Sequence, residues 1–275
     1  MNAASRSRVL VWLDPTAPQE ASLEVLAGLG SASEILGLFV EDSTLLNLSR
    51  LRVAREVTFE GSTGQQMDQR RIEQQFRVHG ERMRTLFETA TRRISASHSF
   101  RVARGELRTE LLSVSADFDM LVLVHSRHHF GVRLNVRAQL GDLLTGGPRT
   151  LVFVQEQWRT GQRVVALFDR SPANEAALRT GAAIAAAEGL ELSILLPDVA
   201  DEQRLELHER AREILGDDTF YSFRTIAAGD VNALVRAADA ENARVLVVPG
   251  AEPTDTIRVV TELLDRVSCS LIVAR

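Results

Sequence analysis

Short apolar runs alternate with amphipathic stretches along the whole chain. In its first part, runs rich in Val, Leu, Ile and Phe occupy residues 9–13, 36–40, 99–103, 120–124 and 151–154. Continuous apolar character over a few residues is typical of strands that are buried on both faces of a sheet. The runs therefore predict five strands of a parallel sheet.

Apolar residues between these runs recur at helical spacing. Ile72, Phe76, Met83 and Phe87 lie on one face of an amphipathic helix that we expect over residues 68–95. Further helices are expected over residues 107–116, 202–215 and 231–240. Strands that alternate with helices indicate βαβ units with right-handed crossovers.

The pattern of apolar runs and amphipathic stretches occurs twice along the chain. RVLVWLDPTAPQEASL (8–23) aligns without a gap with RVVALFDRSPANEAAL (163–178). Later blocks recur in the same order, pairing 36–42 with 192–198, 99–106 with 222–230, 119–126 with 243–250 and 143–155 with 263–275. Self-similarity of this kind indicates duplication. We infer a first domain over residues 1–156 and a second over 162–275.

Composition narrows the class of protein. All 32 basic residues are arginine and the net charge is −5, which argues against nucleic acid or an anionic membrane as partner. Without lysine, there is no P-loop lysine and no Schiff base. The single cysteine, Cys269, lies in an apolar run and is expected to be a buried structural thiol. The apolar run near the N-terminus is too short for a signal peptide, and no segment is long enough to span a bilayer, so we expect a cytoplasmic protein.

Each copy resembles the universal stress protein family. The resemblance rests on a strand followed by Asp-x-[Ser/Thr], a second strand ending in a valine-acid corner, a glycine after the third strand, and the Asp119-Met-Leu-Val start of the fourth. It implies an α/β fold of two tandem open-twisted five-stranded parallel sheets with helices on both faces. It also implies pairing through the fifth strands, residues 150–155 and 270–275, within one chain as a pseudo-dimer or between chains as a homodimer.

Many members of this family bind ATP at the carboxyl ends of the strands. The resemblance makes Asp14 and Asp169 contacts for adenine or ribose, and makes the backbone of Val40 an adenine contact. Helix capping is the alternative role for both aspartates, because Asp is favoured near helix starts. In the second copy, Leu196-Pro197 occupies the corner, and proline removes a backbone donor.

Family members hold the phosphates with a loop after the fourth strand that reads Gly, two residues, Gly, nine residues, Gly, then Ser or Thr. Counted by this spacing, His128, Gly131 and Gly141 take the glycine positions, and Asp142 replaces the hydroxyl residue. Counted from the flanking strands, His125 and His128 take the first two positions and no glycine survives. Both alignments damage the motif, and Asp142 would repel a phosphate.

Three interpretations of this loop stay open. Arg127, Arg133 and Arg137 without an acidic residue over 120–140 favour a modified anion site, since arginine binds phosphate bidentately. A solvated connector is the second interpretation. The third is a metal site at His125, His128 and His129, which has no neighbouring cysteine and no HExxH spacing, so we expect none.

The second copy has lost more of the loop. Gly250 is its only glycine, and Glu252 and Asp255 bring negative charge. Residues 157–275 hold 13 arginines against 19 acids, whereas residues 1–156 hold 19 against 18. We expect its nucleotide site, Asp169 and Gly250, to be lost.

No catalytic motif stands out, so we do not expect an enzyme. The sequence favours a non-catalytic stress-response regulator or scaffold with degraded ATP-binding loops and an unidentified protein partner. The alternative is a nucleotide sensor that binds ATP in the first domain alone. Its site residues are Asp14, Val40, Arg127, Gly131, Arg137 and Gly141.

Overall fold

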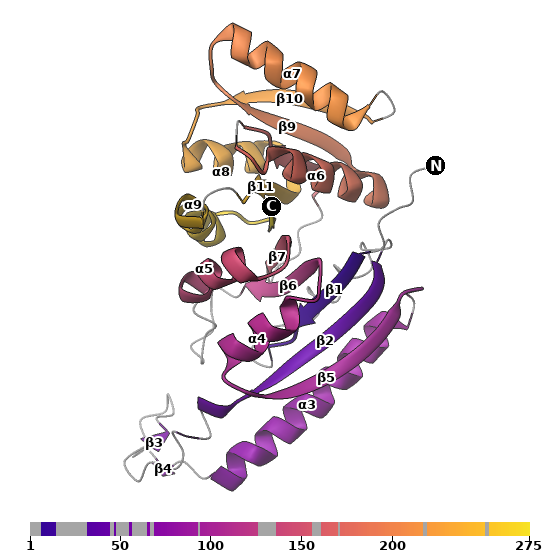
Figure 1. The fold of residues 1–275 in the computed structure, drawn as a ribbon, viewed down its shortest axis with the longest axis vertical. Coiled ribbons are helices and arrows are strands. Elements are labelled where there is room, and N and C mark those ends of the chain that lie inside the picture. Colours follow the sequence, from indigo (N-terminus) through magenta and orange to yellow (C-terminus); the bar gives the residue numbers. More distant parts are fainter. Residues whose placement is uncertain are drawn as a thin grey trace.

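The computed structural model describes residues 7–14, 32–44, 47, 55–56, 65–66, 69–92, 94–125, 136–155, 161–169, 171–216, 219–250 and 253–275. Within these residues, ten strands form one continuous, mostly parallel sheet with helices on both faces (Figure 1). The predicted α/β class is confirmed. The strand order is β10-β9-β8-β11-β12-β7-β6-β1-β2-β5.

The first half of the sheet contains the five predicted strands, and each is longer than its apolar run. Its elements are β1 (Ser7–Trp12), β2 (Ala32–Asp42), β3 (Arg55–Glu56), β4 (Gln65–Gln66), α3 (Gln69–Thr91), β5 (Ser97–Gly105), α4 (Leu107–Ser115), β6 (Met120–His125), α5 (Val136–Gly146) and β7 (Thr150–Gln155). β3 and β4 form a separate antiparallel pair that the pattern did not predict. Helix α3 ends earlier than expected, because Ile94 and Ala96 pack in the core on the way into β5.

The second half repeats the order of the first. Its elements are β8 (Arg163–Leu167), α6 (Asn174–Glu188), β9 (Glu191–Pro197), α7 (Asp201–Leu215), β10 (Tyr221–Ile226), α8 (Val231–Ala240), β11 (Ala243–Pro249), α9 (Pro253–Arg266) and β12 (Ser270–Ala274). Within each half of the ten-stranded sheet, all neighbouring strands are parallel.

The two halves meet at their fifth strands. β12 pairs antiparallel with β7, with Ile272 opposite Val152 and Val273 opposite Leu151. The pseudo-dimer pairing thus occurs within the chain, and it makes the sheet continuous. Because β6 flanks β7 and β11 flanks β12, both fifth strands are interior, with no edge there for a second chain.

Apolar side chains on the two faces of the sheet form two cores. Helices α4, α5, α8 and α9 contribute to one core, and α3, α6 and α7 contribute to the other. Each core contains residues of both halves, such as Leu10 with Leu271 on one face and Phe39 with Ile272 on the other. The halves therefore share their hydrophobic interior, which couples their stabilities.

Strand pairing corrects the alignment of the second-strand blocks by one residue. Arg8 pairs with Glu34 in the first half and Arg163 with Glu191 in the second, so Glu34 corresponds to Glu191. Val40 then corresponds to Pro197, not to Leu196. Side-chain burial supports this corrected alignment, because the equivalent residues Leu38 and Leu195 lie in the same hydrophobic core. A shift of one residue would place their side chains on opposite faces of the sheet.

Two smaller expectations concern Cys269 and the membrane. Cys269 is buried, as expected for a structural thiol. In the part of the chain that the structure describes, no helix combines the length and the apolar character that crossing a bilayer requires.

Candidate functional site

The carboxyl ends of parallel strands form the edge where ligands bind in open α/β sheets. In the first half, Asp14 is the second residue after β1, Val40 lies near the end of β2, and Arg137 lies in the first turn of α5. Only the backbone of Arg137 is described. Arg127 and Gly131 lie outside the described residues. Asp14, Val40 and Arg137 thus lie toward this edge, whereas Gly141 lies further along α5.

The end of β2 offers backbone groups at this edge. The β1–β2 pairing reaches Trp12 and Leu38, and the Leu13 N–H donates to the Leu38 carbonyl over 2.9 Å. The β2–β5 pairing continues further, to Asp42 and Gly105. The side chain of Val40 is buried in the core, so a ligand at this corner would contact its backbone and not its side chain.

Gly141 has a packing role. It lies inside α5, and a Cβ atom built on it would be 3.3 Å from Cδ1 of Ile257 on α9. A side chain here would press on the contact between the two halves. The next residue, Asp142, forms an ion pair with Arg108, with 2.6 Å between Oδ2 of Asp142 and Nη2 of Arg108. The carboxylate that we expected to repel a phosphate therefore lies beside a positive charge.

Asp169 shapes the turn after β8. Its Oδ1 atom accepts a hydrogen bond from the Ser171 N–H over 2.8 Å, and its backbone carbonyl accepts one from the Asn174 side chain. The residue that caps α6 is Ala173, so Asp169 stabilises a local turn and does not cap the helix itself.

Gly250 is covered by residues 273–275, in and just after β12. Its N–H donates to the Ala274 carbonyl over 2.7 Å. A Cβ atom on Gly250 would lie 2.7 Å from Cγ of Arg275 and 2.9 Å from Cγ1 of Val273. Nη2 of Arg275 donates to the carbonyls of Gly147 and Pro148, just beyond α5. The amide of Gly250 is therefore used within the sheet, where a phosphate loop would leave it for the ligand.

The histidines give no metal site in the described residues. His125 ends β6 opposite Gln155, and Pro249 ends β11 opposite Ala274, so the register places His125 where the second half has Gly250. The alignment of residues 119–126 with 243–250, which paired Ser126 with Gly250, is therefore wrong by one residue. This agrees with the alignment counted from the flanking strands. His128 and His129 lie outside the described residues, and among the described ones no group of three His, Cys, Asp or Glu could hold a metal ion.

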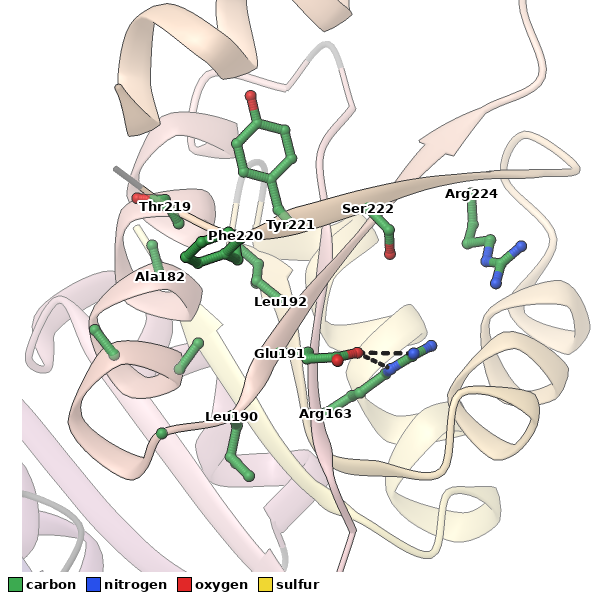
Figure 2. A pocket seen from close by; sticks show the side chains of 13 residues that line it. Arg163, Ala182, Leu190, Glu191, Leu192, Thr219, Phe220, Tyr221, Ser222 and Arg224 are labelled. Atoms are coloured by element: carbon green, nitrogen blue, oxygen red, sulfur yellow. Dashed lines mark hydrogen bonds and ion pairs between the residues drawn. The ribbon is translucent and has the colours of Figure 1, made fainter. Parts of the chain in front are cut away.

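The opposite, amino-terminal edge of the second half carries an open groove of about 690 Å³, here called the amino-edge groove (Figure 2). It runs from the last two turns of α6 across the first residues of β9 and β10. Its lining residues are Arg163, Ala182, Ala185, Ala186, Gly189, Leu190, Glu191, Leu192, Thr219, Phe220, Tyr221, Ser222 and Arg224.

One end of this groove is an ion-pair network. Arg163 binds Glu191, with 2.9 Å between Nε and Oε2, and also contacts the largely buried Glu241. Nε of Arg224 donates to Oε1 of Glu241 over 2.9 Å. Burial alone would raise the pKa of Glu241, but the two guanidinium groups outweigh it and hold that pKa below its ordinary value.

The pattern along the sequence did not reveal this network or the groove. The first half has a related pair, in which Nε of Arg8 lies 2.8 Å from Oε2 of Glu34. Arg8 and Arg163 are among the identical positions of the repeat, and each is followed by a glutamate at the start of the next strand. That recurrence was a usable signal for the network, whereas the groove depends on how α6 and β10 come together.

Solved structures with a similar fold cover almost the whole chain. A universal stress protein from Archaeoglobus fulgidus DSM 4304 is 16% identical, with a TM-score of 0.67 over 98% of this chain and 97% of its own. A candidate universal stress protein from Pseudomonas aeruginosa UCBPP-PA14 is 15% identical, with a TM-score of 0.57 over 98% and 94%. A protein of unknown function from P. aeruginosa PAO1 is 15% identical, with a TM-score of 0.55 over 98% and 93%. No protein-family model and no curated protein matches the chain. At these identities the likeness shows a shared fold.

Proposed function

We propose that this chain is a tandem universal stress protein of the cytoplasm, with domains over residues 1–156 and 162–275, that acts as a non-catalytic regulator or scaffold in a stress response. The observation that carries the proposal is the closure around Gly250. Its amide is bonded to Ala274, and Arg275 and Val273 fill the space beside it. The second domain therefore acts through its surfaces, on an unidentified protein partner.

Two features of the first domain support a second candidate, an adenine-nucleotide sensor. Beyond Leu38, β2 extends past its pairing with β1, which leaves backbone groups near Val40 for an adenine ring. Arg108 also forms an ion pair with Asp142, which offsets part of the repulsion that the sequence alone predicts. In this alternative Asp14, Val40, Arg127, Gly131, Arg137 and Gly141 surround the nucleotide.

Calorimetric titration with ATP, ADP and AMP, with and without magnesium, separates the two candidates. The scaffold predicts no binding heat at millimolar nucleotide. The sensor predicts micromolar binding that Asp14→Ala and Gly131→Glu abolish. Asp169→Ala is the matched control in the second domain, and it should leave such binding unchanged.

Micromolar binding that is lost in Asp14→Ala and kept in Asp169→Ala would overturn the scaffold proposal. Binding lost only in Asp169→Ala would overturn both candidates, because it would place the nucleotide in the closed half. Thermal unfolding of each variant without nucleotide shows whether the fold is intact.

A further inference from the structure

We propose that the amino-edge groove binds a small, uncharged and largely apolar molecule that carries one hydrogen-bonding end. The groove lies at the edge opposite Asp169 and Gly250, so this site is separate from the nucleotide question. Its volume of about 690 Å³ lies within the usual range of small-molecule sites, on the order of 300–1,000 Å³.

The apolar part of the groove is smooth. Ala182 and Ala186 lie one turn apart on α6, Gly189 caps the end of this helix, and the three present only methyl groups or backbone. Leu190 and Leu192 continue this surface at the start of β9. A surface of small side chains admits a flat apolar molecule, since nothing projects from it to block close contact.

Phe220 supplies an aromatic wall. It is 92% exposed, the highest exposure among the described large apolar side chains, and Figure 2 shows it beside Leu192 and Ala182. Strand pairing aligns Ser222 with Ser99, so the first half has Ser97 where the second has Phe220. The fold therefore does not need an aromatic ring at this position. A bound molecule would cover the ring of Phe220, which is now exposed to solvent.

The charges at the other end of the groove balance one another. Arg163 and Arg224 are the cations, and both are paired with Glu191 or Glu241. An anionic ligand would have to compete with these carboxylates, whereas an uncharged ligand can hydrogen-bond beside them. The exposed hydroxyl of Ser222 adds a polar group at the same end. The geometry thus selects against a phosphate.

The probe for this site is N-phenyl-1-naphthylamine, an uncharged aromatic amine whose fluorescence rises in apolar surroundings. We expect saturable binding of one probe per full-length chain. Phe220→Ala should weaken binding about tenfold, the size of effect expected when an aromatic anchor is truncated. Ala186→Phe, which fills the groove from an exposed position on α6, should weaken it at least as much.

Leu205→Ala is the matched control, because Leu205 is 63% exposed on α7 and does not line the groove. It should leave the probe affinity unchanged. Fluorescence that does not saturate, or that Phe220→Ala and Leu205→Ala change equally, would overturn the proposal. Unfolding temperatures equal to the wild type establish that a loss of binding is local.

A second titration tests the charge argument with 8-anilino-1-naphthalenesulfonate, a similar ring system that carries a sulfonate. We expect it to bind more weakly than the uncharged probe. Glu191→Gln removes one partner of Arg163 and should raise its affinity about threefold or more, without a matching gain for the uncharged probe. Tighter binding of the sulfonate to the wild type would contradict the proposed ligand class.

Discussion

The two halves of the sheet share one strand order and differ at both of their edges. At the carboxyl edge, the second half uses the Gly250 amide for its own strand contact and has Pro197, which lacks a backbone donor, near the end of β9, while the first half carries His125 and Val40 at these two positions. At the amino edge, the second half has Phe220 at the groove, and the equivalent residue of the first half is Ser97. The comparison teaches that the interior keeps its apolar character in both halves although its residues differ, as with the buried and equivalent Phe39 and Leu196, whereas the strand ends can change their chemistry in each half separately.

The largest effect is expected where the halves agree. Leu151 in β7 and Leu271 in β12 are equivalent and fully buried. Leu151→Ala and Leu271→Ala should each lower the free energy of unfolding by about 2–5 kcal/mol through lost burial and a cavity. Chemical denaturation measured by circular dichroism should show one cooperative transition for each, because both cores span both halves. Two separate transitions would mean that the halves unfold independently.

An intermediate effect is expected at the closed carboxyl edge. In Gly250→Ala the new methyl group would overlap Arg275 and Val273, which should cost about 1–3 kcal/mol in thermal unfolding. Gly146→Ala is the control, because a Cβ atom there meets nothing within 4 Å and the residue ends α5. A second variant, Gly250→Ala with Arg275→Ala, should recover part of the loss. An unchanged unfolding temperature in Gly250→Ala would contradict the described closure.

The smallest effect concerns an equivalent aromatic pair. Phe100 of the first half corresponds to Phe223 of the second. The Cζ atom of Arg84 lies 4.9 Å from the centre of the Phe100 ring, and the centres of the His208 and Phe223 rings lie 4.0 Å apart. Burial, followed by the charges of Arg212 and Arg204, lowers the pKa of His208 below its ordinary value. Since the folded state then binds the proton less well than the unfolded state, this contribution is present above about pH 6.5 and is lost as the pH falls below it.

We expect His208→Gln to flatten the fall in unfolding free energy between pH 7.5 and 5.5, by less than about 1 kcal/mol because the imidazole is partly solvated. Arg84→Gln should leave that pH dependence as in the wild type, since Arg84 packs on Phe100 in the other half and does not contact His208. Equal pH profiles for wild type and His208→Gln would remove His208 as the titrating group.

Much of the fold could be predicted because its causes are local. The apolar runs at residues 9–13 and 120–124 predicted β1 and β6, and the spacing of Phe76, Met83 and Phe87 predicted α3. Register is harder, because the runs LGLFV and LSILL are apolar throughout and can slide past each other by one residue. The polar residues Glu34 and Glu191 would have anchored it. β3 and β4, with two residues each, are too short to give a periodic signal.

The candidate sites could be predicted only in part. Asp14, Asp169 and Gly250 follow the ends of their strands and Val40 lies near the end of β2, so their edge was predictable from chain order. The ion pair of Arg108 with Asp142 joins two helices, and the contact of Gly141 with Ile257 joins the two halves. Such contacts depend on tertiary packing, which no spacing along the chain encodes.

The antiparallel pairing of β7 with β12 has a consequence for symmetry. Two identical chains joined in this way would be related by a two-fold axis, and every substitution would then appear twice, once on each side. In a single chain the same contact has only approximate symmetry, and covalent connection keeps the partner present at a high effective concentration. Each substitution appears once, so the second half can have Phe220, or use the amide of Gly250 for a strand contact, while the first half keeps different residues at the equivalent positions.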